Sequence, residues 1–282
     1  MISICEGERC ARGCDGGCRE GGAFGGVISL FPTVNGEVVG WRDTPVKAHI
    51  PKHPTRVYLI RHGEVEQRYH RVFGGGRIDM GLSPLGYAHA EALAEWFGNA
   101  PLDAVYASPM VRARETAGPL IKARGMEPVV LEGLREVDFG DWTGHGWAEV
   151  QEKFGVVAYD WLEVLERGGI ANGETGEELR RRVRPCIQRV LEENAHRDVA
   201  VVCHGGIVRV ILSLLLETPL AHTAHFNVDY GSVTQLELQP HKKHAIEIEL
   251  LNFCPLSDRG AGGRAAGERV QAGVGGLKKE GA

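Results

Sequence analysis

Between residues 53 and 256 the chain alternates short apolar runs with longer amphipathic segments, and this alternation restricts the fold more than any other feature. The apolar runs are rich in β-branched and aromatic residues, which is typical of buried strands. They predict strands at 56–61, 103–107, 128–131, 199–203, 233–238 and 245–251. Helical spacing of apolar residues predicts helices at 83–97, 109–124, 176–193 and 206–216. The pattern therefore predicts an α/β fold, a three-layer α/β/α sandwich with a mostly parallel sheet.

The two ends of the chain differ in composition from this middle part. Residues 1–50 hold 10 of the 39 glycines and residues 255–282 hold 8, and neither end has sustained apolar periodicity. Such segments bury too little apolar surface to offset their conformational entropy. We therefore predict a mostly disordered Gly/Cys-rich leader over 1–52, a folded domain over 53–256, and a disordered Gly-rich tail over 257–282. Within the leader, Asn35-Gly36 is a turn signal that favours a hairpin between Phe24 and Val39.

Seven cysteines are present, four of them in the leader. The leader spacing, C-x4-C-x3-C-x3-C, lacks the C-x2-C pairs of common zinc sites, so we favour unpaired thiols there and leave a metal site as the alternative. The leader cysteines are Cys5, Cys10, Cys14 and Cys18. The other three, Cys186, Cys203 and Cys254, lie in apolar surroundings and are predicted to be small core residues.

Polar motifs follow four of the predicted strands, at the point where each strand ends. They are Arg61-His62-Gly63-Glu64, the segment from Ser108 to Thr116 that contains Arg112, the segment from Leu134 to Gly144 that contains Glu136, and His204-Gly205-Gly206. Loops at the carboxyl ends of parallel strands meet at one edge of the sheet. We therefore expect two imidazoles, at least two guanidiniums and a carboxyl group to lie together. Phosphoryl transfer needs such a set, because its transition state carries negative charge on the phosphoryl oxygens.

These four motifs, in this order, resemble those of the histidine phosphatase superfamily, the phosphoglycerate mutase-like enzymes. The resemblance runs from about Arg56 to Leu238 and implies that residues 53–256 form a catalytic domain with a small helical lid at about 140–172. It implies that His62 is the nucleophile and forms a phosphohistidine intermediate. A neutral imidazole nitrogen can attack if the proton on the other nitrogen is held by an acceptor.

The resemblance also implies roles for the other residues at this edge. Arg61 and Arg112 would clamp the phosphoryl oxygens, with His204 as a further donor, and Glu136 would protonate the leaving oxygen and then deprotonate water. The backbone amide of Gly205 would favour an anion at a helix N-terminus. The guanidiniums make a metal ion unnecessary, and no cofactor is expected. Further substrate-binding residues are expected to be Gly63, Glu64, Gly74 in a glycine-rich loop, and Arg68.

Arg68 stands six residues after His62, where the family often has asparagine. Its guanidinium would either add a contact to a second acidic group on the substrate or point into solvent.

The predicted site residues also have simpler interpretations. Arg61 and Arg112 could be surface ion-pair partners, and Asp138 or Asp141 could be the acid in place of Glu136.

The substrate is expected to be a small phosphorylated metabolite. The segments 134–144 and 172–175 most resemble small monoester phosphatases, such as alpha-ribazole phosphatase and its broad-specificity relatives. Glu174 stands only 38 positions after Glu136. This segment is shorter than in the mutases, which implies a lid that admits water. Hydrolysis is therefore favoured over the first alternative, a cofactor-dependent phosphoglycerate mutase. The aromatic residues expected to line or brace the lid are Trp142, Trp147, Phe154, Tyr159 and Trp161.

Two further alternatives remain. Cys203 and Arg209 form a C-x5-R pattern, as in cysteine-dependent phosphatases, but that mechanism leaves His62 and Arg112 without a role. A scaffold that binds phosphorylated partners without turnover would normally have lost His62 or Glu136.

Overall charge and hydropathy narrow the range of partners. A net charge of −5 argues against a protein whose main task is binding nucleic acid. No apolar run approaches the roughly 18 residues of a membrane span, and the N-terminus lacks the order of a secretory signal. The sequence therefore predicts a cytoplasmic protein without nucleic-acid or membrane partners, and it leaves a homodimer open.

Overall fold

The computed structural model describes residues 33–34, 37–38, 54–239 and 246–257. The chain divides into two units, Met1–Lys47 and Ala48–Ala282. In the first unit, β1 (Thr33–Val34) and β2 (Glu37–Val38) pair antiparallel, in agreement with the hairpin expected there. The turn residues 35–36 and the four leader cysteines lie outside the described residues. Apart from these four strand residues and Ser257, so do the leader and the tail for which disorder is predicted.

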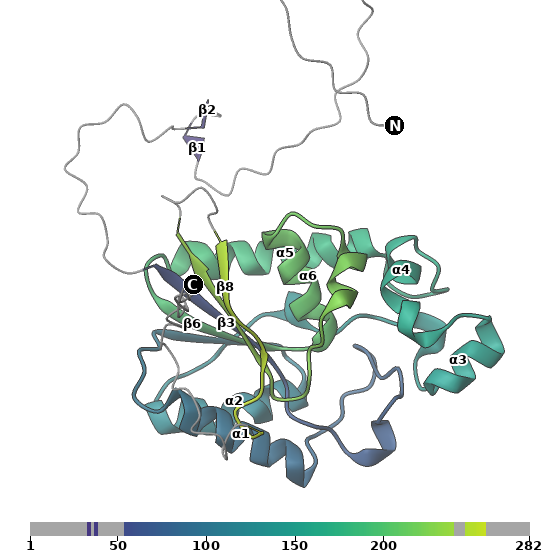
Figure 1. Cartoon of the computed structure of the whole chain (residues 1–282), viewed down its shortest axis with the longest axis horizontal. Helices are drawn as coiled ribbons and strands as arrows, with labels where there is room; N and C mark the ends of the chain where they lie inside the picture. The colour runs from purple at the N-terminus through teal and green to yellow at the C-terminus, as the bar shows by residue number, and fades with distance from the viewer. Residues whose placement is uncertain (1–32, 35–36, 39–53, 240–245, 258–282) are drawn as a thin grey trace, which may run out of the picture. The chain divides into compact units, whose positions relative to one another are not determined.

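The second unit contains a six-stranded sheet with the order β5-β4-β6-β3-β7-β8 (Figure 1). β3, β4, β5 and β6 are parallel, whereas β7 runs antiparallel to β3 and β8 antiparallel to β7. The mostly parallel α/β sheet is thus confirmed. The strands are β3 (Thr55–Arg61), β4 (Ala104–Ala107), β5 (Val129–Val130), β6 (Asp198–Cys203), β7 (Val233–Leu238) and β8 (Ile246–Phe253).

Helices cover both faces of this sheet and complete the three layers. One buried cluster joins Tyr58 and Ile60 of β3 to Leu93 of α1 and Leu120 of α2. A second, larger cluster joins the opposite face of the sheet to α5 and α6. These two helices lie on the other side of the sheet from α1 and α2 (Figure 1). The helices are α1 (Pro84–Phe97), α2 (Val111–Arg124), α3 (Trp147–Phe154), α4 (Trp161–Glu166), α5 (Gly176–Glu193) and α6 (Gly205–Leu215).

The central strand β6 shows why the sheet forms this way. All six of its residues are buried, because β3 and β4 flank it and helices pack on both of its faces. A continuous apolar sequence without polar alternation is typical of such a strand. The carboxyl ends of β6 and β3 lie side by side, with Cys203 in register with Arg61. This register places the residues that follow the two strands next to each other.

Local signals explain where the helices begin. The Ser83 hydroxyl accepts a hydrogen bond from the amide of Gly86 (3.0 Å), and Pro84 occupies the first helical position of α1. Thr175 and Glu178 form a reciprocal capping box at the start of α5. Pro185 lies inside α5, which continues past it as a single helix to Glu193.

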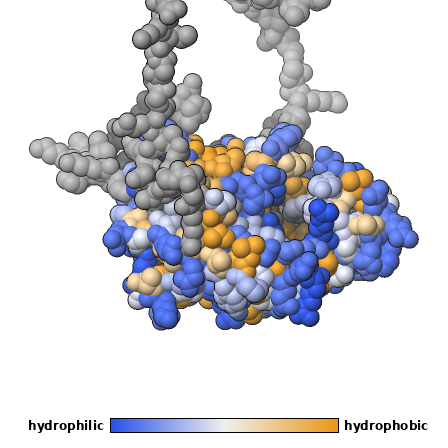
Figure 2. Space-filling view, turned by 60° about the horizontal axis from the view of Figure 1, so that its bottom comes forward, coloured by the Kyte–Doolittle hydropathy of each residue, from blue (hydrophilic) through white to orange (hydrophobic). Residues whose placement is uncertain are grey.

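The segment 140–172, predicted as a helical lid, contains α3, α4 and two short 3-10 helices, η3 (Gly140–Trp142) and η4 (Ala158–Asp160). Three more 3-10 helices complete the described second unit: η1 (Gln67–Tyr69), η2 (Glu132–Leu134) and η5 (Leu220–His225). On the face seen in Figure 2, hydrophilic residues cover much of the surface and apolar residues gather in smaller patches. Within the described part of the chain, no helix is both long and apolar enough to cross a bilayer.

The cysteines of the second unit differ in burial. Cys203 is fully buried at the end of β6, as expected. Cys186 and Cys254 are only half-buried, which corrects their prediction as core residues. Their sulfur atoms lie beside backbone carbonyls, 3.5 Å from the oxygen of Arg182 and 3.7 Å from that of Tyr230. Cys186 packs against the larger core cluster from outside it. Apolar neighbours in the sequence therefore do not ensure complete burial.

Candidate active site

A cavity opens at the carboxyl edge of the sheet, where β3, β4 and β6 end. Among the residues that line it are five selected from the sequence: Arg61, His62, Gly74, Arg112 and Glu136. The lining also includes the aromatic residues Tyr69, Phe73, Phe139 and Tyr230, for which no sequence pattern predicts a place in the site. The parallel crossovers therefore bring motifs up to 75 residues apart, from Arg61 to Glu136, into one cavity.

His62, directly after β3, is buried and held through both ring nitrogens. Its Nδ1 lies 2.8 Å from the carbonyl oxygen of Gly63, so this nitrogen carries the proton and donates it. Its Nε2 therefore has the lone pair and accepts a hydrogen bond from Nε of Arg112 (3.1 Å). Burial, followed by the charges of Arg112 and Arg61, holds the pKa of His62 well below its usual value. The imidazole is thus neutral near pH 7, with a lone pair at the cavity.

Arg112, in the first turn of α2, is buried with only 3% of its surface exposed. Besides His62, its guanidinium donates to the carbonyl oxygens of Ile78 (3.2 Å) and Gly75 (3.1 Å). Gly75 adopts a φ of +53°, a conformation that other residues rarely adopt, and this aims its carbonyl at the arginine. The glycine-rich loop therefore holds the guanidinium in place.

Arg61, the last residue of β3, contributes the second guanidinium. Its Nη1 donates to the carbonyl oxygen of Val228 (2.6 Å), and its Cζ lies 3.9 Å from the centre of the Tyr230 ring. Its Nε is buried and has no hydrogen-bond partner among the described residues. A buried donor without an acceptor costs free energy. A bound oxyanion would supply that acceptor.

His204, directly after β6, is fully buried, and its ring centre lies 5.1 Å from that of His62. Its Nε2 lies 2.7 Å from the hydroxyl oxygen of Ser108, which follows β4. Its Nδ1 is buried without a partner among the described residues. Burial, followed by the charge of Arg112, holds the pKa of His204 well below its usual value. If the Ser108 hydroxyl donates to Nε2, the proton of His204 is on Nδ1, which is then a second buried donor without a partner in the described structure, in addition to Nε of Arg61. His204 itself is not part of the cavity lining.

Glu136 is the carboxylic acid among the described residues that line the cavity. Its Oε2 accepts from the amide of Gly206 (3.3 Å), and its Oε1 accepts from the amide of Val137 (3.0 Å). The two competing acids lie outside the lining. Asp138 pairs with Arg77 (2.6 Å), and Asp141 accepts from the side chain of Asn172 (3.0 Å).

The remaining predicted residues lie around the cavity rather than in its wall. The amide of Gly63 donates to the hydroxyl of Thr116 (2.9 Å), and Glu64 accepts from the hydroxyl of Ser83 (2.6 Å). Gly205 begins α6, where a Cβ atom would lie 3.5 Å from Nε of Arg61. Arg68 is exposed, forms an ion pair with Glu66 (3.0 Å), and is outside the lining.

The aromatic residues expected to line or brace the lid are not part of the cavity lining. Trp142 is buried, and its ring centre lies 5.3 Å from that of Phe73. Tyr159, at the other extreme, is 70% exposed. Phe73 and Phe139 contact the cavity instead. Isolated aromatic residues on irregular segments carry no periodic signal that would distinguish these positions.

The residues of the cysteine alternative do not assemble into a site. Cys203 is fully buried, and burial together with the charge of Glu136 raises its pKa, which disfavours the thiolate. Arg209 donates to the carbonyl oxygen of Thr223 and stacks over Phe226. Neither Cys203 nor Arg209 lines the cavity.

Among the described residues, the cluster of side chains spaced for a metal ion comprises Glu237, Glu247 and Glu249. Glu237 forms an ion pair with Arg56 (2.7 Å) near the start of β3, whereas His62 follows the end of that strand. This acidic cluster is therefore separate from the cavity.

The chain is similar to known proteins both in sequence and in structure. The family model described as histidine phosphatase superfamily (branch 1) matches residues 57–250. The adenosylcobalamin/alpha-ribazole phosphatase of Salmonella typhimurium is 28% identical over 187 residues, 65% of this chain and 90% of that protein. Phosphoserine phosphatase 1 of Hydrogenobacter thermophilus is 26% identical over 199 residues, 69% of this chain and 92% of that protein. The solved structure of a mycobacterial glucosyl-3-phosphoglycerate phosphatase superposes with a TM-score of 0.62 at 25% identity, over 70% of this chain and 98% of that one.

Proposed function

The chain belongs to the histidine phosphatase superfamily (branch 1), and from this premise we propose that it hydrolyses phosphate monoesters through a phosphohistidine intermediate on His62. It acts as a phosphomonoesterase on small phosphorylated metabolites. The observation that carries the proposed mechanism is the state of His62: a neutral imidazole whose Nδ1 proton is held by Gly63 and whose Nε2 lone pair lies beside a guanidinium.

In the first step, Nε2 of His62 attacks the phosphorus atom of the monoester, and a P–N bond forms. The P–O bond to the leaving alcohol breaks, and its electron pair goes to the leaving oxygen. The carboxyl group of Glu136 transfers its proton to that oxygen, so that the alcohol leaves neutral and Glu136 becomes a carboxylate.

In the second step, a water molecule attacks the phosphorus atom, and the carboxylate of Glu136 takes a proton from it. The P–N bond breaks, and its electron pair returns to Nε2 of His62. Inorganic phosphate leaves, the imidazole is neutral again, and Glu136 is again protonated. The cycle therefore consumes one water molecule per monoester and regenerates both side chains.

The transition states of both steps place negative charge on the phosphoryl oxygens. Arg61 and Arg112 supply the neutralising charge, and the two unused buried donors, Nε of Arg61 and Nδ1 of His204, supply hydrogen bonds. Monoester hydrolysis without an enzyme is so slow that this machinery must lower the barrier by on the order of 20 kcal/mol. We assign this role to the guanidiniums and histidines, without a metal ion.

Relatives of the chain are named for monoesters with chemically different alcohols: phosphoserine, alpha-ribazole phosphate and glucosyl-3-phosphoglycerate. The shared element is the phosphoryl group, which His62, Arg61 and Arg112 would bind. The proposal is therefore a phosphatase for a small monoester. The side chains outside the phosphoryl subsite, among them Tyr69 and Phe139, would select the alcohol.

The mechanism is tested by two single variants, His62→Ala and Cys203→Ser, assayed with 4-nitrophenyl phosphate in the presence of a chelator. We expect His62→Ala to lose at least 10³-fold in kcat and Cys203→Ser to retain activity. An intermediate trapped with labelled substrate should be acid-labile and alkali-stable, as expected for a phosphoramidate. Loss of activity in Cys203→Ser alone would overturn the mechanism.

The mutase alternative is separated by a different assay. With 3-phosphoglycerate and trace bisphosphoglycerate, we expect release of free phosphate. An isomerised product without free phosphate would instead show a mutase.

A further inference from the structure

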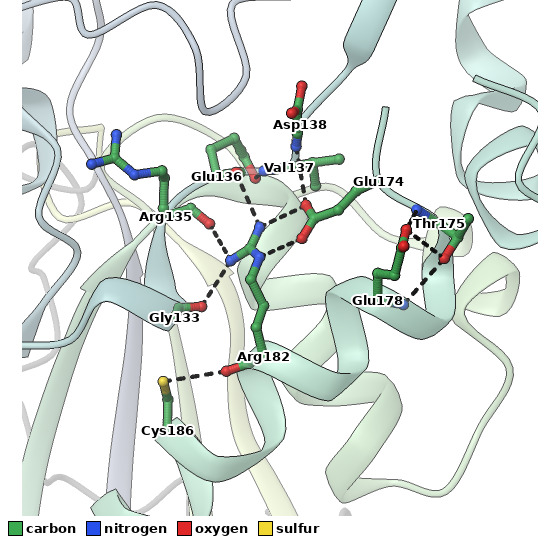
Figure 3. A network of polar contacts seen from close by, with 10 residues as sticks. All are labelled: Gly133, Arg135, Glu136, Val137, Asp138, Glu174, Thr175, Glu178, Arg182 and Cys186. Atoms are coloured by element: carbon green, nitrogen blue, oxygen red, sulfur yellow. Dashed lines mark hydrogen bonds and ion pairs between the residues drawn. The ribbon is translucent and has the colours of Figure 1, made fainter. Parts of the chain in front are cut away.

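Glu136 lies on a loop that is held by one residue of α5, Arg182 (Figure 3). All the N–H groups of this guanidinium have acceptors nearby. Nη1 donates to the carbonyl oxygens of Gly133 (2.8 Å) and Arg135 (2.7 Å), and Nη2 donates to that of Glu136 itself (3.1 Å). The remaining donors form a bidentate ion pair with Glu174. Nε lies 2.5 Å from its Oε1, and Nη2 lies 2.8 Å from its Oε2.

Glu174 in turn holds the other side of the same loop. Its Oε2 accepts from the amide of Asp138 (3.1 Å), and its own amide donates to the carbonyl oxygen of Asp138 (2.8 Å). The ion pair therefore fixes the backbone both before and after Glu136. Figure 3 shows Arg182 and Glu174 converging on this stretch of chain from α5 and from the segment just before it.

The carboxyl group of Glu136 has backbone amides as its hydrogen-bond partners, those of Val137 and Gly206. Its position consequently depends on where the loop backbone lies. A displacement of about 1 Å of a reacting group costs on the order of 10²-fold in rate. We infer that the Arg182–Glu174 pair is a positioning device for the acid of the reaction, acting through the backbone of residues 133–138. This inference rests on the proposed function of Glu136.

A merely structural ion pair is the competing explanation, and the chain offers a matched control for it. Arg180, on the same helix, forms a bidentate ion pair with Glu166, and both contacts are 2.8 Å long. Arg180 and Arg182 are similarly exposed, at 21% and 26% of their side chains. The Arg180 pair has no hydrogen bond to residues 133–138 in the described structure. Removing Arg180 therefore costs this pair and a longer contact with Glu177 (3.6 Å) without releasing the loop.

The test compares two substrates that differ in their need for the acid. The leaving group of benzyl phosphate is a strongly basic alkoxide, which departs slowly unless an acid protonates it. The leaving group of 4-nitrophenyl phosphate is 4-nitrophenolate, which departs readily without a proton. The measured quantity is kcat/KM, because it reports on the steps up to transfer of the phosphoryl group to His62. A structural defect would reduce kcat/KM for both substrates alike. A misplaced acid would reduce it mainly for benzyl phosphate.

We expect Arg182→Met to lose about 10²-fold in kcat/KM with benzyl phosphate and less than about tenfold with 4-nitrophenyl phosphate. Glu174→Gln is expected to show the same selectivity, and Arg182→Lys to lie between Arg182→Met and the unchanged protein. The Arg180→Met control should lose less than about threefold with either substrate. In the background of Glu136→Gln, which has no proton to give, adding Arg182→Met should cost less than about threefold more.

The outcomes separate the two hypotheses. If Glu136→Gln loses activity equally on both substrates, the proposed acid role of Glu136 fails. If Glu136→Gln is selective but Arg182→Met is not, or if Arg182→Met resembles Arg180→Met, only the positioning role fails. Circular dichroism confirms folding, and should Arg182→Met not fold, the selectivity of Arg182→Lys and Glu174→Gln decides the question.

Discussion

Replacing Gly206 with alanine should separate the catalytic role of Glu136 from its contribution to stability. Gly206 lies in the first turn of α6, and its amide is one of the two that bind the Glu136 carboxyl group. Its φ is not in the left-handed region, so the alanine backbone is unstrained. The added Cβ would lie 2.6 Å from Oε1 of Glu136 and 2.7 Å from Cγ2 of Val137.

The expected size follows from these contacts. Ordinary contact begins at 3.4 Å, so the carboxyl oxygen must move by about 0.8 Å and the Val137 methyl group by about 0.7 Å. The carboxyl group can swing away at little cost, and crowding of Val137 costs about 1 kcal/mol. Alanine favours a helix by up to about 1 kcal/mol over glycine, which offsets that crowding. We therefore expect the free energy of unfolding to change by less than about 1 kcal/mol.

Activity should respond differently, because the acid would be displaced by most of an ångström. We expect kcat/KM for benzyl phosphate to fall about 10²-fold, and that for 4-nitrophenyl phosphate to fall much less. Urea unfolding of the same samples measures stability. Gly118→Ala, on α2, is the control, since its Cβ would meet nothing within 4 Å. An enzyme with Gly206→Ala that keeps at least a third of the original activity on benzyl phosphate would refute this reasoning.

Two further predictions concern the buried histidines. Ser108→Ala leaves Nε2 of His204 buried without its 2.7 Å partner. We therefore expect urea unfolding to show a destabilisation of about 1–3 kcal/mol, together with a lower kcat. Unchanged stability would contradict the assigned hydrogen bond. Burial and nearby guanidiniums lower the pKa of His62 and His204 in the folded protein, so both bind protons more readily when unfolded. Stability should therefore fall as the pH drops through about 6.5, with a slope that approaches about 1.4 kcal/mol per pH unit for each histidine at lower pH. In urea unfolding between pH 7 and 5.5, His62→Gln should reduce the total loss of stability by about 1.3 kcal/mol over that interval. An unchanged loss would argue against a neutral His62.

The sheet edge that carries the site could be predicted from the local sequence, because strands and helices are recognised by the periodicity of their apolar residues. The apolar run of β6 predicts a buried parallel strand, and such strands place the residues that follow them at one edge of the sheet. This reasoning was enough to bring Arg61, His62, Arg112 and Glu136 together, and the structure places all four in the cavity lining.

Other features depended on side-chain direction within irregular segments, for which no periodicity exists. Glu136, Asp138 and Asp141 lie within six consecutive residues, the first two on a loop and the third in η3. Only the structure shows that Glu136 faces the cavity while the other two bind Arg77 and Asn172. The exposed direction of Arg68, left open by the sequence, likewise follows from its local pairing with Glu66.

By itself, the sequence determined the order of the strands and main helices along the chain, the sheet edge that carries the site, and the last residues of β3, β4 and β6. These follow from short-range patterns of apolar and polar residues. Only the tertiary structure decided the contacts between distant segments. Ser108 meets His204 across 96 positions, and Arg182 meets the Glu136 loop across 46 to 49. Such contacts are set by how helices pack on the sheet, and packing depends on the whole chain at once.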